Sequence, residues 1–324
     1  MSRLPRRGLI AAAIAVPTLV RAQAFPTRPL RLVVPFAPGG STDIIARILA
    51  ARLGPLLGGT VLVENRPGAG GNIGIEAVVR SAPDGYTLVL GAPGGLTVNP
   101  LLYRNLTYQP LRDLAPVAMV ADSELVIAVA RNVPAQDLPG FITHCRANPG
   151  KVSFGSAGVG TTTHLGGALF ALKAGVQLQH VPYRGSALAM NDLVAGTINA
   201  MFDLLPSSIN QIQGGLIRAL ATTGSERAAT LPEVPTVAEA ALPGFRATSW
   251  YALMAPAGTP AEIITTISRA TVAALGEAAV KERIAAAGAV AWPTDAAGLA
   301  RILRDDSERW AEVVREARIT LDNN

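Results

Sequence analysis

Two segments of the chain follow the same plan, in which an apolar strand runs into a glycine-rich loop and then into a helix. In the first, the strand Leu30 to Phe36 leads into the loop Ala37-Pro38-Gly39-Gly40-Ser41-Thr42-Asp43, and the isoleucines and leucines that follow recur at helical spacing. The second is VSFGSAGVGTTTHLG, Val152 to Gly166, where Leu165, Leu169 and Leu172 have that spacing. Two loops of one design, over a hundred residues apart, predict two α/β domains facing each other across a cleft.

Each loop is suited to an anion, because the first N–H groups of a helix have no partner within the helix and the positive end of the helix dipole lies there. Two nucleotide-binding motifs fail in the second loop. A Walker A loop would need lysine where Thr161 stands, and the dinucleotide fingerprint would need glycine where Thr163 stands. The loops therefore predict an anion site that is not a nucleotide site.

The start of the chain has the composition of an export signal. Arg3, Arg6 and Arg7 precede an uncharged stretch, and Ala22-Gln23-Ala24 provides small residues for cleavage. We expect residues 1–24 to be removed and the protein to act in the periplasm. The arginine pair resembles a twin-arginine signal, although Pro5 departs from that pattern, and the general secretory route stays open. Because ATP and NAD are not reliably supplied outside the cytoplasm, we expect a small carboxylate as the ligand.

Charge and length agree with a two-domain exported protein. The chain has 28 Lys+Arg and 23 Asp+Glu, and four arginines leave with the signal, so the mature balance is 24 minus 23, or +1. This balance and an aromatic content of 5% argue against nucleic acid as a partner. The single cysteine, Cys145, cannot form an internal disulfide. The mature length of 300 residues (324 minus 24) predicts two domains at about 150 residues each.

Strand and helix patterns alternate along most of the chain. Strands are predicted around 61–64, 86–90, 179–181, 198–203, 217–221 and 250–255, helices around 75–80, 186–195 and 206–213, and a mainly helical last third. Alternation of this kind is typical of parallel sheets. The predicted fold class is thus α/β, with mainly parallel sheets around a cleft.

Several ordered motifs resemble the Bug family, the extracytoplasmic solute receptors of tripartite tricarboxylate transporters. They are FPTRPLRLVVPFAPGGSTDIIAR from Phe25, VLVENRPGAGGNIG from Val61, FGSAGVGTTTHL from Phe154, VPYRGSALAMNDLVAGTINAMFD from Val181, LPEVPTVAEAALPGF from Leu231 and SWYALMAPAGTP from Ser249. The resemblance covers essentially the whole mature chain. It departs from the family at Ala92-Pro93-Gly94-Gly95, where members commonly have a serine-rich turn near the cleft.

The resemblance implies a two-domain periplasmic-binding fold, type II-like, with two crossover strands. One domain would comprise residues 25–124 and 248–324, and the other residues 125–247. It also implies a small organic acid bound between the two loops, closure of the domains on it, and delivery to integral-membrane transporter subunits. A hinged receptor needs no second copy, so we expect a monomer, and neither a cofactor nor a metal is expected.

In the first loop, Ala37, Gly40 and Ser41 are candidate ligand-binding residues through backbone N–H groups and the Ser41 hydroxyl. The alternative is a plain N-cap by Ser41 or Thr42, and the two roles are compatible. Asp43 has the wrong charge for an anion, so we expect it to stabilise the helix N-terminus or to orient the loop by accepting its N–H bonds.

In the second loop, Ser156, Thr161 and Thr162 offer hydroxyls, and Gly158 and Gly160 allow close backbone approach. An ordinary tight turn is the alternative there.

Two further candidate ligand-binding residues are a histidine and an aspartate. His164 either donates to the ligand or, as we prefer, braces the loop from behind. Asp203 either faces the cleft, where it would favour an amine, hydroxyl or protonated acid, or caps the helix near 206–213.

Two other functions were weighed. A secreted hydrolase has candidate residues in Ser156, His180 or His164, and Asp203, but Phe154 breaks the nucleophile motif G-x-S-x-G. A ligand sensor of the same fold, signalling to a partner other than a transporter, has the same binding chemistry and stays open. The sequence therefore favours a binding protein over an enzyme.

Overall fold

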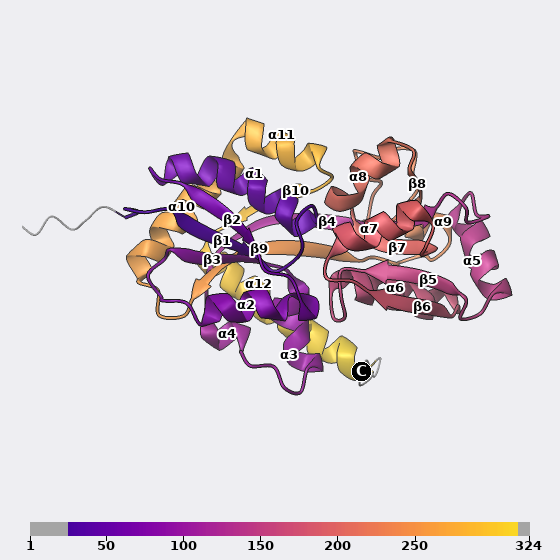
Figure 1. The fold of residues 1–324 in the computed structure, drawn as a ribbon, viewed down its shortest axis with the longest axis horizontal. Helices are drawn as coiled ribbons and strands as arrows, with labels where there is room; N and C mark the ends of the chain where they lie inside the picture. The colour runs from indigo at the N-terminus through magenta and orange to yellow at the C-terminus, as the bar shows by residue number, and fades with distance from the viewer. Residues whose placement is uncertain (1–24, 317–324) are drawn as a thin grey trace, which may run out of the picture.

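The computed structural model describes residues 25–316, so the predicted export signal lies outside the described residues. An N-terminal lobe is built on the first three strands and a central lobe on the strands β5 to β8 (Figure 1). The elements up to the first crossover strand are β1 (Leu30–Val34), α1 (Ser41–Leu56), β2 (Val61–Asn65), η1 (Ala69–Gly71), α2 (Asn72–Val79), β3 (Thr87–Gly91), η2 (Gly94–Val98), α3 (Asn99–Leu102), α4 (Pro110–Asp113) and β4 (Leu114–Ala130).

The remaining elements complete the central lobe and return to the N-terminal lobe. The former are α5 (Leu138–Ala147), β5 (Val152–Ser156), α6 (Thr162–Ala174), β6 (Leu178–Pro182), α7 (Ser186–Ala195), β7 (Ala200–Leu204), α8 (Leu205–Gln213), β8 (Ile217–Thr222) and α9 (Val237–Ala240). The latter are β9 (Thr248–Pro256), α10 (Ala261–Gly276), α11 (Ala278–Ala286), β10 (Val290–Thr294) and α12 (Ala296–Glu316).

The two lobes share one sheet, with strand order β2-β1-β3-β9-β4-β7-β5-β6. The long strands β4 and β9 lie side by side and cross from one lobe to the other, and β8 and β10 also pair with β4. The expected parallel pairing is found between β1 and β2, β1 and β3, β5 and β6, and β5 and β7. The described pairs that include β4 or β9 are antiparallel, so the crossover strands join the parallel strands of the two lobes in a mixed sheet. The reason is the return of the chain between lobes, which no strand–helix alternation encodes.

Helix α6 shows how apolar spacing can mislead. The predicted face of Leu165, Leu169 and Leu172 is only partly buried, since Leu165 is 5% exposed but Leu172 is 69% exposed. The buried residues of the helix include Gly166, Gly167, Phe170 and Ala174. An added Cβ at Gly167 would lie 2.4 Å from the Phe154 ring, so α6 packs on the sheet through small residues rather than through its leucine stripe.

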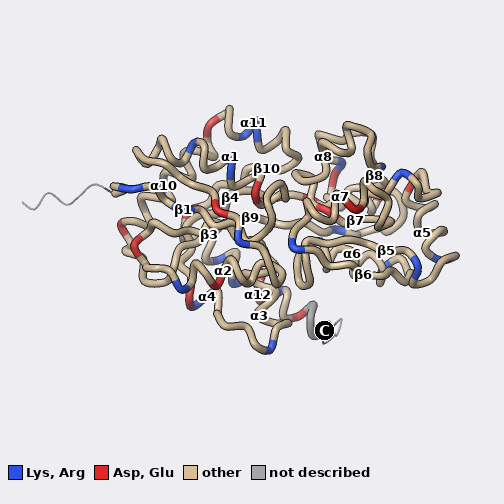
Figure 2. The backbone as a smooth tube through the Cα atoms, in the orientation of Figure 1, with Lys and Arg blue, Asp and Glu red and all other residues tan. Residues whose placement is uncertain are grey.

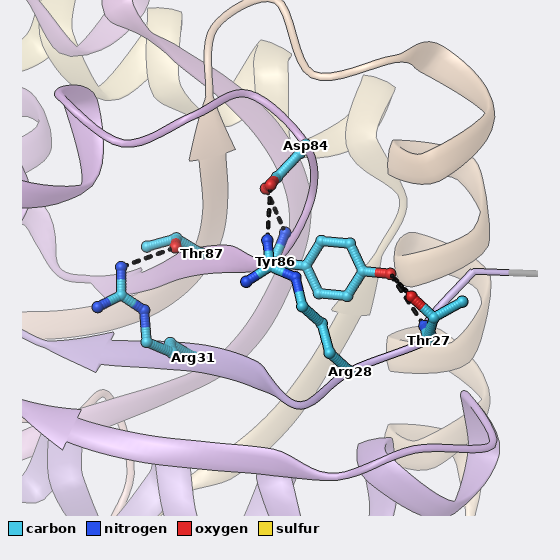
Figure 3. A network of polar contacts seen from close by, with 6 residues as sticks. All are labelled: Thr27, Arg28, Arg31, Asp84, Tyr86 and Thr87. Carbon is cyan, nitrogen blue, oxygen red and sulfur yellow. Dashed lines mark hydrogen bonds and ion pairs between the residues drawn. The ribbon is translucent and has the colours of Figure 1, made fainter.

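The first residues after the predicted cleavage site are fastened to the N-terminal lobe (Figure 3). Thr27 N–H donates to the Tyr86 hydroxyl at 2.9 Å, and the Arg28 guanidinium contacts Asp84 at 2.8 Å while lying 4.1 Å from the centre of the Tyr86 ring. The Phe25 ring meets the same tyrosine edge-on, with ring centres 5.0 Å apart. These contacts hold the start of the described chain beside β1 and β3.

Charged residues of both signs are spread over the two lobes (Figure 2). This mixture of signs agrees with the near-neutral mature balance. Among residues 25–316, no single helix is long and apolar enough to cross a membrane, and α10 with α11 passes that test only as a pair bent by 73°.

Candidate functional site

A small cavity of about 30 Å³ lies between the two lobes, where several helices begin. Its lining includes the first residues of α1, α6 and α7 and the residue before α8. The full set is uncharged and consists of Phe36, Gly40, Ser41, Thr42, Ala92, Gly94, Ala157, Thr161, Thr162, Thr163, Ser186, Leu204 and Ser249. The cavity is therefore an enclosure of hydroxyls, helix N-termini and small apolar groups.

The first loop leaves the N-terminus of α1 without a side-chain cap. Gly40 is the N-cap residue, and because glycine has no side chain it cannot form a side-chain capping hydrogen bond. The predicted alternative of a cap by Ser41 or Thr42 is therefore wrong. Ser41 and Thr42 instead occupy the first helical turn, are buried, and line the cavity. The N–H groups of that turn have no partner within the helix. They lie at the cavity wall, at the positive end of the helix dipole.

Asp43 holds the first loop from outside the cavity. Its Oδ2 accepts from Gly39 N–H at 2.9 Å and from Arg47 at 2.9 Å, and its Oδ1 accepts from Asn65 at 2.9 Å. Burial alone would raise the pKa of this carboxyl, but the hydrogen bonds from Arg47, Gly39 and Asn65 and the Arg47 charge outweigh it and lower the pKa below its usual value. Asp43 is thus an ionised anchor, as expected, and lies outside the cavity lining.

The second loop is held by its own side chains. Thr161 is the N-cap of α6: its hydroxyl oxygen accepts from His164 N–H at 3.4 Å, and its hydroxyl donates to the Gly158 carbonyl at 2.6 Å. Thr163 accepts from Ala157 N–H at 2.9 Å, and Ser156 accepts from Gly158 N–H at 3.1 Å. Thr161 and Thr162 line the cavity, whereas Ser156, Gly158 and Gly160 form the frame around it.

His164 supports the loop rather than lining the cavity. Gly160 N–H donates to His164 Nδ1 at 3.2 Å, which requires that nitrogen to carry no proton. The His164 ring stacks on His180 with centres 4.0 Å apart. Burial lowers the pKa of His164, and burial together with the neighbouring His164 lowers the pKa of His180 to about 3. Both imidazoles are therefore neutral at ordinary pH, and the geometry fits the bracing alternative for His164.

A serine–histidine pair exists but lacks the surroundings of a hydrolase. Ser156 Oγ lies 2.6 Å from His180 Nε2, within reach of a nucleophile and its base. The hydroxyl is fully buried and outside the cavity lining, and the carboxylate of Asp203 is hydrogen-bonded to serines instead of to the imidazole. The pair thus stiffens the second loop.

Asp203 lies behind the cavity, not in it. The side chain is fully buried, and its oxygens accept from Ser186 at 2.5 Å, Ser207 at 2.6 Å and Ser208 at 2.8 Å. The N-cap position of α8 belongs to Leu204, which makes no side-chain capping bond. Asp203 therefore does not face the cleft, because its side chain is fully buried and outside the cavity lining.

The N-terminus of α7 is a part of the site that the sequence analysis missed. Ser186 begins this helix and lines the cavity, after Gly185 with φ of 143°. An added Cβ at Gly185 would lie 3.0 Å from Ala37 N, so glycine is needed for the close approach of the two lobes. Ala37, a candidate ligand residue, instead donates its N–H to the Arg184 carbonyl at 3.3 Å. The signal was present as a Gly-Ser pair before a helix pattern, the same pair that opens α1.

The departure from the Bug pattern at residues 92–95 lies at the cavity, as expected. Ala92 and Gly94 line it, and an added Cβ at Gly94 would lie 3.0 Å from the Gly160 carbonyl oxygen across the gap. Tyr103 closes the same seam by donating to the Val159 carbonyl at 3.3 Å. The two lobes are thus in contact around the cavity, with backbone close to backbone.

A larger cavity of about 240 Å³ has the opposite chemistry. It is formed around β4 and β9, and its lining includes Asp122, Glu124, Glu226, Arg227 and Arg246. Burial raises the pKa of Asp122 to about 6 against the opposing charge of Arg246, and burial also raises the pKa of Glu124. Its lining mixes three carboxyl groups with two arginines, whereas the smaller cavity is uncharged and lies where several helices begin, so the smaller cavity is the candidate ligand site.

Comparison with known proteins identifies the family. Residues 45–319 match the TctC family, described as the tripartite tricarboxylate transporter family receptor. The chain belongs to this family. It is 41% identical over 313 residues to Protein BugT of Bordetella pertussis, which covers 95% of each chain.

Solved structures of family members have the same fold. R. palustris Rpa4515 with adipate is 36% identical with a TM-score of 0.89, and covers 91% of this chain and 99% of that one. MatC from Rhodopseudomonas palustris with bound malate is 32% identical with a TM-score of 0.85, and covers 90% and 100%. The fold is therefore that of the Bug and TctC type of periplasmic binding proteins, which confirms the predicted fold class and the resemblance.

Proposed function

We propose that this protein is an exported receptor that captures a small carboxylate between its lobes and delivers it to integral-membrane transporter subunits. The observation that carries the proposal is the uncharged cavity at which α1, α6 and α7 begin. Three helix N-termini aimed at one cavity favour an anion, and charge-assisted backbone hydrogen bonds contribute about 1.5 to 3 kcal/mol each. The adipate and malate held by two family members are carboxylates of this kind.

The site would act by closure. We propose that residues 25–124 and 248–324 form one domain and 125–247 the other, so that α1 comes from the first and α6 and α7 from the second. Neither domain alone makes the full cavity, because its lining comes from both. A ligand that contacts both domains binds the closed arrangement better and shifts the equilibrium toward it. Ligand contacts would come from Gly40, Ser41, Thr161 and Thr162 directly, while Asp43 and His164 hold the loops.

A thermal-shift panel on residues 25–324 tests this proposal. The panel pairs small carboxylates with their neutral amides. A ligand that binds only the folded state, present at about a hundred times its Kd, stabilises by about 2.7 kcal/mol, and we expect the acid but not its amide to raise the Tm by several degrees. Equal shifts from acid and amide, or none across the panel, would contradict a carboxylate receptor.

Delivery is tested by uptake. Cells that carry this receptor and the two membrane subunits should accumulate the labelled acid identified by the panel, and removal of any one component should stop it. Uptake that persists without the receptor would contradict the delivery role, while binding without any effect on uptake would favour a sensor.

A further inference from the structure

Asp203 is a buried carboxylate next to the cavity that the proposed function does not yet use. It lies on β7 with no exposed surface, and three serine hydroxyls donate to its side chain. Only one of those serines, Ser186, lines the cavity. A buried charge is costly unless it is hydrogen-bonded, so this cluster is held for a structural or a functional reason.

The contact fixes the direction of the Ser186 hydroxyl. A serine hydroxyl has one proton to donate, and Ser186 Oγ lies 2.5 Å from Asp203 Oδ1. When the Asp203 carboxyl is ionised it has no proton, so Oδ1 accepts and Ser186 donates. Burial raises the pKa of Asp203, with the serine hydroxyls opposing the increase. A proton on Oδ2 would leave Oδ1 an acceptor, because Ser207 can donate to the Leu204 carbonyl at 2.9 Å instead. With Asp203 ionised, or with its proton on Oδ2, Ser186 therefore donates to Asp203 Oδ1.

A hydroxyl whose proton is committed presents only lone pairs on its other side. Ser186 Oγ is thus an acceptor toward the cavity, whereas the N–H groups of the first turns of α1, α6 and α7 are donors. The carboxylate of a ligand satisfies the donors but would repel the acceptor. Because Ser186 and the first residues of α1 and α6 line the same small cavity, the group that satisfies Ser186 would lie close to that carboxylate.

We propose, resting on the proposed carboxylate receptor, that Asp203 is a positioning residue that fixes Ser186 as a hydrogen-bond acceptor, so that the site selects acids bearing a hydroxyl or ammonium group near the carboxylate. A plain alkyl acid would leave the buried Ser186 acceptor without a partner. An unsatisfied buried group costs about 1 to 3 kcal/mol, which corresponds to about a tenfold to hundredfold loss of affinity.

The test uses matched pairs that differ in one hydroxyl, namely lactate with propionate and malate with succinate. Titration calorimetry on residues 25–324 measures each Kd. We expect the hydroxy acid of a pair that binds to bind at least about tenfold more tightly than its partner. Equal affinity within a pair overturns the inference and leaves the proposed function intact, whereas a protein that binds no carboxylate loses both.

Variants separate positioning from folding. Ser186→Ala removes the acceptor, and the preference within the pair should fall to less than about twofold, because the plain acid no longer leaves a buried acceptor without a partner and should bind more tightly than it does to the wild type. Asp203→Asn can donate its amide to Ser186, which frees the hydroxyl to donate into the cavity, so the preference should vanish or reverse. Ser207→Ala is the matched control, because it removes a hydrogen bond to Asp203 without touching the cavity.

Melting curves show whether each variant folds. Should Asp203→Asn fail to fold, Ser186→Ala decides the matter alone, since its side chain is smaller and leaves the backbone N–H in place. A Ser186→Ala protein that keeps the wild-type preference overturns the proposal, and so does a Ser207→Ala protein that folds and loses it.

Discussion

The two glycine loops share a plan but are stabilised in different ways. The first loop, residues 37–43, leaves the start of α1 uncapped, and its Asp43 is held by Asn65 and Arg47 from outside the loop. The second loop, residues 156–164, is capped and cross-linked by its own threonines and by His164. The first therefore offers more free donors, and the second offers a fixed shape.

This difference means that similar substitutions should have unequal effects in the two loops. After a substitution in the first loop, contacts from α1 and β2 still hold that loop in place. A substitution in the second loop instead disturbs the hydrogen bonds that the loop makes within itself. The second loop also meets the opposite lobe through its backbone, at Val159 and Gly160. We expect binding to be more sensitive to the second loop.

The largest effect should come from glycines with left-handed backbones. Gly39 and Gly160 have φ of 82° and 79°, so alanine is strained equally at both, by about 1 to 2 kcal/mol. At Gly39 the added Cβ has ordinary room, 3.6 Å from Ala187 Cβ, but at Gly160 it would lie 2.2 Å from Asn99 Oδ1 in the opposite lobe. Gly160→Ala should weaken ligand binding more than about a hundredfold, since it opposes closure, and Gly160→Val should abolish binding in a folded protein.

Calorimetry with the best acid of the panel measures both alanine variants. Gly39→Ala is the control for backbone strain and should lose less than about tenfold. Similar losses in the two would show that strain, not contact between the lobes, limits binding. Retained affinity in Gly160→Val would remove the second loop from the site.

The next largest difference should be in how much the side chains that hold each loop contribute to the free energy of unfolding. Thr161→Val removes the cap of α6 and the hydrogen bond to Gly158, and should lower the free energy of unfolding by about 1 to 2 kcal/mol. Asp43→Asn keeps an acceptor for Gly39, and its ion pair is with an Arg47 side chain that is 53% exposed, so we expect less than about 1 kcal/mol. Urea unfolding of residues 25–324 gives both values. A larger loss for Asp43→Asn would reverse the comparison.

The pH dependence should separate the loops as well. The folded pKa of His180 is about 3, below the unfolded value of about 6.5, so the unfolded state binds more protons and stability falls as pH drops between these values. The lowered pKa of Asp43 gives stability that is present above about 3.8 and lost only in stronger acid. Acid should therefore loosen the second loop first.

The matched variant for this experiment is His180→Phe, which keeps an aromatic ring against Phe154. Asp122, with a folded pKa of about 6, acts in the opposite direction, since its contribution is full below about 3.8 and lost as pH rises through 6. The difference between wild type and variant cancels that background. A difference that does not change between pH 7 and pH 4 would exclude His180 as the cause.

The smallest expected effect is that of salt on affinity. The lining residues of the cavity are uncharged, so the ligand meets backbone dipoles at close range rather than a guanidinium. Raising the ionic strength from about 0.05 to 0.5 M should change the Kd by less than about threefold. A steep dependence would point to a distant cationic surface that steers or holds the acid.

The loops and most elements could be predicted because their signals are local. A Gly-Gly-Ser or Gly-x-Gly-Thr break between a strand pattern and a helix pattern predicts a helix N-terminus whatever the tertiary structure around it. The helix predicted at 186–195 is confirmed as α7 with the same bounds. Its role at the cavity was not predictable in this way, because it depends on the approach of Gly185 to Ala37 across the two lobes.

Asp203 was placed wrongly because strand alternation assumes one buried face and one open face. β7 lies between β4 and β5, and α6, α7 and α8 all contact it, so both of its faces are covered. Alternation then carries no information about exposure. The resemblance implied the two crossover strands, but their antiparallel pairing could not be predicted from the residues, because pairing between distant segments has no local sequence signal.

The crossing of β4 and β9 has a consequence for how such receptors diversify. Glu124 and Thr248 are partners on adjacent strands, so the chain leaves for the central lobe and returns at neighbouring points. The segment between them is contiguous in the gene and carries the second loop, Ser186 and Asp203 together. Exchange of that one segment between relatives would transplant the residues that the central lobe contributes to the cavity lining, with both junctions in a single strand pair, while the first loop stays in place.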